Sequence, residues 1–357
     1  MATPVIAGVI ALYKQAKGKT ISPLAINAAL SSTAVAVNLN DGANTYPHLT
    51  SIAQQGGGLV DAYHMIHAGI TVNVANLALN DTANHVKNAA FYVENTGTTT
   101  QNYVLTHQLA LTAYVFKPND TYDVTGFYSV APIYHNVLGF SNMTFDIKGA
   151  SAVISPSTLT LKPGEKKRVT AAIVPDPSLQ ADLVPVYSGY INISTTTGSE
   201  TIHLPYLGVA TDMNSIPIMN TYLEWPYWDN SDQSPNTTTI ETYQPSQGYY
   251  PLWYWANTWA TKEKRIDVVA HKGPNPVIAA GLATLGPATD TAFWNPRSPT
   301  SAYSSWGFAW DGTFANGSSV KSCEYYLVLR EAKAFANLAR GAGRSMKSTR
   351  VQSFIWT

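Results

Sequence analysis

The spacing of hydrophobic residues changes near residue 70. Before that point, Pro4–Tyr13 is apolar on nearly every face and predicts a helix of the kind that is normally buried. Ser22 followed by Pro23 predicts the start of a second helix, because serine caps helix N-termini and proline fits the first turn. A glycine turn then predicts a third short helix, Asp61–His67. Such helices need a sheet or a larger core to cover them, and we expect this segment to supply none.

From Ile70 the pattern alternates with a period of two and predicts β-strands. Turn residues separate them at 95–97, 162–164 and 197–199, a spacing typical of fibronectin-like or immunoglobulin-like folds. We therefore expect a β-sandwich at 68–212. Its predicted strands are Thr71–Val74, Ala90–Glu94, Tyr103–Thr106, Val153–Ile154, Leu159–Leu161, Val169–Ile173 and Tyr190–Ile193.

The remaining third of the chain predicts a second β-module. Pro226–Tyr250 is rich in Asn, Ser, Thr, Gln and Pro and predicts a long loop, although aromatic residues interrupt it. Later alternating segments predict strands at Arg265–Val269, Ser305–Trp310 and Tyr325–Arg330. We place this β-sandwich module at 213–357, so the expected fold is mainly β, with tandem β-sandwiches after a helical segment at 1–67.

Composition agrees with a mainly β chain and suggests few charged partners. The sequence has 21 Tyr and 9 Trp, with a formal net charge of +0 and only 12% charged residues. The sequence shows no basic face, so it gives no indication of nucleic-acid binding. Cys323 is the single cysteine, so neither an intrachain disulfide nor a cysteine-based zinc site can form, and we expect no metal and no cofactor.

Signals of secretion are mixed. Asn-x-Ser/Thr sequons, the acceptor motif for N-glycosylation, occur at Asn80, Asn119, Asn142, Asn192, Asn236 and Asn316. The apolar opening segment contains Pro4 and Gly8, lacks a basic start and is too short to span a bilayer, so it predicts neither a signal peptide nor a membrane anchor. We expect a secreted or cell-surface protein whose signal peptide lies upstream of Met1.

Two motifs in the helical segment resemble the subtilisin-like serine protease family. Met1-Ala2-Thr3-Pro4 and Gly8 are similar to the residues that follow the nucleophile in the subtilase pattern Gly-Thr-Ser-Met-Ala-(Thr or Ser)-Pro. Val5 stands where the family commonly has an aromatic residue or histidine. The run Gln55–Asp61 resembles the Gln-Gly-(Ala or Gly)-Gly-Leu motif that closes subtilase catalytic domains.

The β-modules resemble those of large C5a-peptidase-like subtilases, with extended fungal members as the nearest likeness. In the predicted sandwich the similarity rests on Leu79–Thr82, Val93–Gly97, Ile154–Ser157, Leu161–Glu165, Val186–Ile191 and Leu204–Val209. Near the end it rests on Trp310–Thr313, Ala315–Gly317 and Tyr326–Arg330. Cys323 and Glu324 stand where glycine is usual, so the last hairpin is expected to turn differently here.

The resemblance implies the C-terminal part of a secreted serine endopeptidase. Residues 1–67 would be the last helices of a truncated α/β catalytic domain, followed by a fibronectin-III-like domain and a C-terminal module. The family order Asp, His, Asn, Ser places every catalytic residue before Met1, so this chain contains no catalytic residue and is expected to be inactive alone, because a triad is worth roughly 10⁶ in rate. Its implied partners are the missing N-terminal portion and the protein or peptide substrate of the intact protease.

Other chemistry has weak support in the sequence. His48, His64 and His67 lie near Asp41 and Asp61 along the chain, but no serine stands in a nucleophile-elbow context. His64 and His67 at i, i+3 could share a helix face, yet two ligands without a third rarely hold a metal. We expect these two on a helix surface. Three further histidines are expected to be surface or satisfied polar residues: His107, His135 and His203.

An aromatic cluster leaves two readings open. It comprises Trp225, Trp228, Tyr249, Tyr250, Trp253, Trp255 and Trp259. Buried rings would form a sandwich core, the reading we favour, whereas exposed rings would form a platform for sugars or a protein. The alternative function is therefore a non-catalytic secreted β-sandwich protein that binds carbohydrate or a cell-surface partner. A third alternative is an incomplete gene product. Asp311 is expected to fix a turn.

Overall fold

A computed structural model describes residues 2–115, 144–216, 227–229, 241–243, 252–255, 260–270, 285–289, 292–295, 306–321, 324–333 and 353–356. The described chain is mainly β and forms two compact units, one made of the residues up to Asp212 and the other of those from Met213 on. The expected fold class is confirmed. The finer boundaries at 67 and 212 stay predictions.

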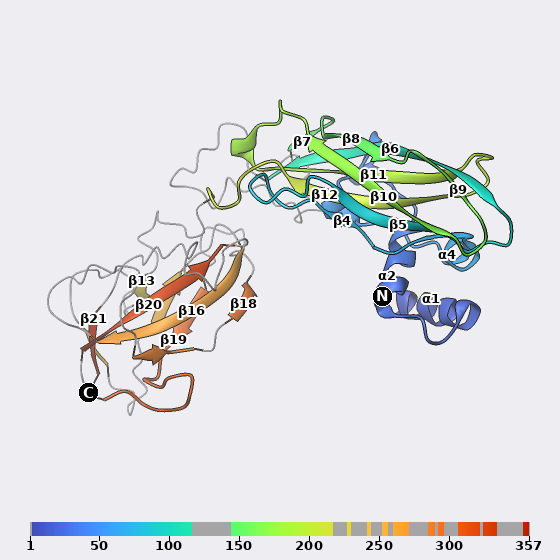
Figure 1. Ribbon diagram of the computed structural model, residues 1–357. Coiled ribbons are helices and arrows are strands. Elements are labelled where there is room, and N and C mark those ends of the chain that lie inside the picture. The colour runs from blue at the N-terminus through green and yellow to red at the C-terminus, as the bar shows by residue number, and fades with distance from the viewer. Residues whose placement is uncertain are drawn as a thin grey trace. The chain divides into compact units, whose positions relative to one another are not determined.

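Three of the four helices described in the first unit match the expected positions. The four helices are α1 (Ala2–Lys17), α2 (Pro23–Ser32), α3 (Ile52–Gln55) and α4 (Ala62–His67). Ser22 caps α2 by accepting a hydrogen bond from the Ala25 amide (3.2 Å), and Pro23 occupies its first turn. α1 packs against α4, and α2 packs against strands of the sandwich (Figure 1). Short α3 was not predicted.

The expectation that residues 1–67 supply no sheet is wrong. Strands β1 (Asn38–Asn40) and β2 (Thr45–Leu49) form an antiparallel hairpin in this segment. Asp41 closes the turn by accepting hydrogen bonds from the backbone amides of Ala43 (2.8 Å) and Asn44 (2.6 Å). Three- to five-residue strands with mostly exposed side chains carry little alternation, so the sequence pattern missed them.

Two sheets form the predicted sandwich (Figure 1). The first has the order β3-β5-β10-β8 and the second the order β4-β12-β11-β6-β7, with β9 also paired to β6. Alternate residues of β5 and β10 are buried between the sheets, as two-layer packing requires. The elements are β3 (Ile70–Val72), β4 (Leu77–Ala78), β5 (Ala89–Asn95), β6 (Gln101–Tyr114), β7 (Thr144–Asp146), β8 (Ala150–Ser155), β9 (Thr158–Leu161), β10 (Lys166–Pro175), the short 3₁₀ helix η2 (Ala181–Leu183), β11 (Pro185–Thr195) and β12 (Thr201–Val209).

Every strand expected in 68–212 is present, and three further strands were not predicted. β4 and β7 are two and three residues long, too short for a periodic signal. β12 is nine residues long but nearly all of its residues are wholly or partly buried, so it lacks the polar positions that make alternation visible.

Two tyrosines lie across from two glycines on β11 and β12. In the antiparallel register, Tyr187 opposes Gly208 and Tyr206 opposes Gly189. A Cβ atom added at Gly208 would lie 2.3 Å from the Tyr187 hydroxyl oxygen, and one at Gly189 would lie 2.6 Å from that of Tyr206. Both tyrosines are fully buried. The glycines therefore make room for rings that cover the neighbouring strand, which explains the spacing of this part of the motif.

The two buried hydroxyls differ in their partners, which leads to a testable prediction. The Tyr206 hydroxyl lies 2.7 Å from His107 Nε2, whereas the Tyr187 hydroxyl has no hydrogen-bond partner among the described residues. We expect Tyr206→Phe to lower the free energy of unfolding by about 1–2 kcal/mol, and Tyr187→Phe to leave it unchanged or raise it. Urea unfolding of both variants measures the difference. Equal losses in the two would contradict the assignment.

The second unit contains two sheets of its own. One has the order β13-β15-β19, and the other has the order β14-β21-β20-β16-β17, with β18 paired to β16. The expected long loop at 226–250 is therefore interrupted by two three-residue strands. The strands are β13 (Tyr227–Asp229), β14 (Glu241–Tyr243), β15 (Leu252–Trp255), β16 (Thr261–Ala270), β17 (Gly286–Pro287), β18 (Ala292–Asn295), β19 (Trp306–Ala309), β20 (Glu324–Ala332) and β21 (Ser353–Trp356). The three strands predicted for this module are confirmed.

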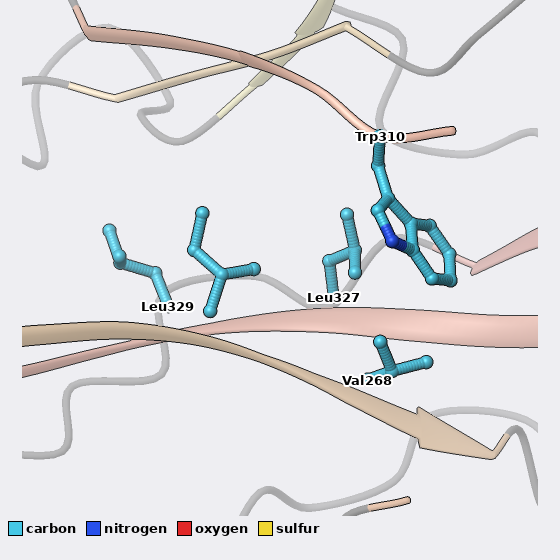
Figure 2. Close-up of a cluster of buried hydrophobic side chains, with 5 residues drawn as sticks. Val268, Trp310, Leu327 and Leu329 are labelled. Atoms are coloured by element: carbon cyan, nitrogen blue, oxygen red, sulfur yellow. The ribbon is translucent and has the colours of Figure 1, made fainter. Parts of the chain in front are cut away.

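Trp310 is the centre of the described core in this unit. Its ring is 1% exposed and packs with Ile266 and with the three residues that Figure 2 labels beside it, Val268, Leu327 and Leu329. Its indole nitrogen donates a hydrogen bond to the Thr313 carbonyl (2.7 Å), which satisfies the buried polar atom. Asp311 accepts from the Thr313 amide (2.9 Å) and hydroxyl (2.6 Å), so its predicted role in a turn is confirmed.

A buried ion cluster on β16 and β20 was not foreseen. Asp267 is fully buried, and its carboxylate lies 2.9 Å from Arg265 Nε and 2.7 Å from Arg330 Nε. A buried carboxylate needs such partners, because losing one leaves an uncompensated charge in the core. Alternating charged residues on a strand gave no indication that Asp267 points inward.

Candidate functional site

The residues of the first subtilase-like motif lie at the start of α1. Ala2, Thr3 and Pro4 form its first turn, where the missing proline N–H is not needed, and Gly8 follows one turn later. All four are exposed. Met1 lies outside the described residues. The structure therefore places the motif at the open end of a helix, with no described side chain over it.

Most of α1 is uncovered. Only Val9 and Tyr13 of its side chains are buried, against α2 and α4, whereas Val5 and Leu12 are 58% and 53% exposed. Fully burying a valine or leucine side chain contributes about 1.5–3 kcal/mol. Between Val5 and Leu12, the other exposed residues of α1 are Ala7, Gly8 and Ala11. The side of α1 that carries Val5 and Leu12 therefore has no cover among the described residues.

The second motif, Gln55–Asp61, joins the helical segment to the sandwich. The Gly56 carbonyl accepts a hydrogen bond from the Tyr190 hydroxyl (3.2 Å), and the Gly57 carbonyl lies 2.8 Å from His203 Nε2. Gln55 binds the β1–β2 hairpin by accepting from the Val37 amide (2.8 Å) and donating to the Thr50 carbonyl (2.7 Å). We call the run Gln55–Asp61 the clip, because it joins the helical segment to strands β11 and β12.

Close backbone packing explains the glycines of the clip. A Cβ atom at Gly57 would lie 2.5 Å from the Ser31 carbonyl oxygen, and one at Gly58 would lie 2.2 Å from the Val35 carbonyl oxygen. Gly58 also has φ +119°, a conformation that favours glycine. Val35 and Leu59 exchange backbone hydrogen bonds of 2.7 and 2.9 Å beside it.

A buried serine on β11 also holds the helical segment against the sandwich, and its hydroxyl group is hydrogen-bonded to backbone groups. Ser188 on β11 is fully buried; its hydroxyl donates to the Leu111 carbonyl (3.2 Å) and accepts from the Ile52 amide (3.1 Å). Ile52 also packs on Tyr190 and Ala110 from the sandwich. The hydroxyl is occupied by two backbone groups, so Ser188 positions α3 on β11.

Asp41 and Asp61, the two carboxylates that lie near histidines in the sequence, both have structural hydrogen-bond partners. Besides its two amide bonds, Asp41 accepts from the Tyr46 hydroxyl (2.7 Å), and these hydrogen bonds, led by that of the Asn44 amide, lower the pKa of Asp41 to about 2. Asp61 caps α4 by accepting from the His64 amide (2.8 Å). Among the described residues, no serine hydroxyl bonds to His48, His64 or His67.

Each described histidine in this paragraph has a different partner, and none of these partners is another histidine. His64 Nδ1 lies 3.2 Å from the Thr33 carbonyl, and His67 stacks on Tyr63 with ring centroids 4.3 Å apart. His107 and His203 each have the partner described above, which confirms that they are satisfied polar residues, and burial lowers the pKa of both. Within the described ranges, no group of three or more His, Cys, Asp or Glu could hold a metal. His135 lies outside those ranges.

Three of the six sequons fall on described residues. The Asn80 amide donates to the Asn84 carbonyl (3.2 Å), and that of Asn192 on β11 donates to Gln108 (2.9 Å). Asn316 lies in an exposed turn, where its Oδ1 accepts from the Ser318 amide (3.0 Å) and hydroxyl (2.7 Å). Glycosylation stays a prediction at all six sites. Outside the described residues lie Asn119, Asn142 and Asn236.

Little of the aromatic cluster can be placed. Trp228 belongs to β13, and Trp253 and Trp255 belong to β15, which pairs with β13 and β19. Burial of these rings, and with it the choice between core and platform, stays a prediction. Four members and Cys323 lie outside the described residues: Trp225, Tyr249, Tyr250 and Trp259.

A cavity in the first unit contains residues that sequence reasoning missed. It is lined by residues from α1, α2 and the outer face of the β3-β5-β10-β8 sheet, among them Tyr13, Tyr92, Glu94 and Lys166. Strand alternation marks the last three as outward-facing but gives no sign that α2 lies across from them. No motif signals the site.

Comparison with known families agrees with the sandwich geometry. Residues 77–207 match the family model described as an Fn3-like domain. The chain contains an Fn3-like domain. The match covers the paired sheets from β4 into β12 and includes Tyr187, Gly189 and Tyr206, and it ends one residue before Gly208. No curated protein matches the chain. No described helix is long and apolar enough to cross a membrane.

Several solved β-sandwich structures resemble the chain weakly. A PapD-like domain of human CEP192 is 13% identical with a TM-score of 0.24, over 40% of this chain and 84% of that domain. The CsuC–CsuE chaperone–tip subunit complex of Acinetobacter baumannii is 11% identical with a TM-score of 0.25, over 81% and 100%. The CupB2 chaperone of Pseudomonas aeruginosa is 7% identical with a TM-score of 0.24, over 80% and 98%.

Proposed function

We propose that this chain is the C-terminal part of a secreted subtilisin-like serine endopeptidase. Residues 1–67 would complete a catalytic domain whose nucleophile precedes Met1, and the Fn3-like domain and the last module would shape substrate access or orient the protease. The chain by itself would be inactive. Two observations support the proposal. The motif residues Ala2–Gly8 open α1, and the motif Gln55–Asp61 joins the helical segment to the Fn3-like domain through hydrogen bonds.

The exposed face of α1 supports this proposal independently of the sequence similarity of the two motifs. Val5 and Leu12 are exposed, and nothing lies within 4 Å of a Cβ atom built at Gly8. A helix-interior glycine costs about 0.5–1 kcal/mol relative to alanine. No close packing at Gly8 among the described residues compensates for this loss of helix stability. A glycine would, however, allow a covering sheet to approach α1 closely.

Gly8→Ala separates the isolated chain from the proposed whole. In the chain as given, we expect the variant to raise the stability of α1 by about 0.5–1 kcal/mol, because alanine restricts the unfolded state and meets no neighbour. Hydrogen exchange of α1 peptides measures the gain. Ala16→Gly, on an exposed position of the same helix, should produce the opposite change. A loss of stability in Gly8→Ala would mean that this face is already packed.

The decisive experiment for the proposal is to sequence the transcript upstream of the Met1 codon. Gly-Thr-Ser in frame, with Asp and His motifs further upstream, would establish the protease. The longer protein should then hydrolyse casein and be blocked by a serine-directed inhibitor, whereas the chain as given should not. A true 5′ end at Met1, or casein hydrolysis by this chain alone, would sink the proposal.

A second candidate is a non-catalytic secreted β-sandwich protein that binds carbohydrate or a cell-surface partner. The Fn3-like match supports it as well, since that domain requires no catalytic residues. The aromatic residues of 225–259 would supply the contact surface. Binding to wall polysaccharides that disappears in Trp253→Ala would favour this candidate, and absence of binding to any of them would count against it.

A further inference from the structure

A cavity of about 700 Å³ lies between the helical segment and the outer face of the β3-β5-β10-β8 sheet. Tyr13 reaches it from α1, Leu24 from α2 and Tyr92 from β5. Its volume falls within the roughly 300–1,000 Å³ range of small-molecule sites. All of its lining residues belong to the first unit, so it does not depend on the placement of the second.

Opposite charges face this cavity without protein partners. Glu94 on β5 and Lys166 on β10 are directly opposed in the antiparallel register, and both line the cavity. Neither side chain makes an ion pair or hydrogen bond with any residue that the structure describes. The neighbouring pair Glu165 and Lys167, by contrast, is joined at 3.5 Å. One carboxylate and one ammonium group therefore remain available to a ligand.

The rest of the lining is largely apolar. Ile21 and Leu24 contribute aliphatic walls, and the Tyr13 and Tyr92 rings add aromatic surface. Leu24 is 78% exposed and Tyr92 is 42% exposed, so both can be reached from solvent. The Tyr92 amide donates to Asn73 Oδ1 (2.7 Å), which holds the Asn73 side chain at the rim with its NH₂ group free of described partners.

We propose that this cavity binds a small zwitterion with an apolar side chain. Lys166 would pair with its carboxylate, Glu94 with its ammonium group, and the aliphatic and tyrosine surfaces would take up the side chain. A neutral sugar would leave both charges unpaired, and a simple anion would face Glu94. Two sources share this chemistry, a free hydrophobic amino acid and a short hydrophobic peptide with free termini. The inference does not rest on the proposed protease function.

Isothermal titration of the full chain tests the assignment. The probes are L-leucine, L-phenylalanine, the dipeptide Leu-Phe and N-acetyl-leucine amide, which has the same side chain as leucine but no charges. We expect binding of at least one charged probe and none of the blocked one. Preference for the amino acids or for the dipeptide identifies the source.

Charge-neutral variants locate the binding. Lys166→Gln and Glu94→Gln should each weaken it about tenfold or more, as expected when a charge-assisted hydrogen bond is lost. Lys167→Gln removes the same charge from the next residue, which does not line the cavity, and should stay within about twofold of the parent. Unchanged thermal unfolding confirms folding of each variant. Equal effects of the two lysine variants, binding of the blocked probe, or no binding at millimolar concentration would each overturn the proposal.

Discussion

Replacing Gly208 with alanine is expected to lower the free energy of unfolding of the first unit by about 3 kcal/mol. The new methyl group would lie 2.3 Å from the Tyr187 hydroxyl oxygen and 2.4 Å from its Cζ atom. The Tyr187 ring is fully buried in the sandwich and cannot move into solvent. Either the ring or the β11–β12 pairing must shift, and both cost packing in the core.

Separate probes can assign this loss to the correct unit. All nine tryptophans lie at position 225 or beyond, so tryptophan fluorescence reports only the second unit. Hydrogen exchange of β11 and β12 peptides reports the first. Gly149→Ala is a suitable control, because its one contact below 3.4 Å would be with the end of the Leu109 side chain, 2.9 Å away. The interpretation fails if Gly208→Ala is no more harmful than this control.

Gly58→Ala should produce a loss of similar size, about 3 kcal/mol, at the clip. Its methyl group would lie 2.2 Å from the Val35 carbonyl oxygen, and alanine rarely adopts φ +119°. The paired Val35 and Leu59 amides should lose protection from hydrogen exchange, while the sandwich core keeps most of its own. The helical segment would come away from β11 and β12 first.

Gly42→Ala isolates the conformational part of that loss. Gly42 has φ +91° in the β1–β2 turn, and nothing lies within 4 Å of a Cβ atom built there. We expect about 1 kcal/mol of destabilisation, from backbone strain alone. If Gly42→Ala and Gly58→Ala cost the same, the close contact with Val35 has no energetic role.

Local signals predicted most of the elements. Ser22 and Pro23 mark the start of α2, and Asp61 marks that of α4, because capping depends on residues adjacent in sequence. Alternation located β5 and β10, whose opposite faces meet different environments. β12 was missed because both of its faces are covered, one by the sandwich core and one by the clip.

Long-range features were beyond reach of the sequence alone. The partners Gly56 and Tyr190 are 134 positions apart, and nothing local to either indicates the other. The same holds for the cavity, where α2 lies over Glu94 and Lys166. The motif Gln55–Asp61 was recognised, but its physical role required the carbonyl and hydroxyl contacts to be seen.

During synthesis on the ribosome, the clip is made well before the strands to which it bonds. Gly56 is synthesised 134 positions before Tyr190, whose hydroxyl group donates a hydrogen bond to the Gly56 carbonyl. At about 5–20 residues per second, on the order of ten seconds pass before β11 emerges. During that time the apolar helices at the start of the chain have no sandwich on which to fold, and they are exposed to the chaperones that bind nascent chains.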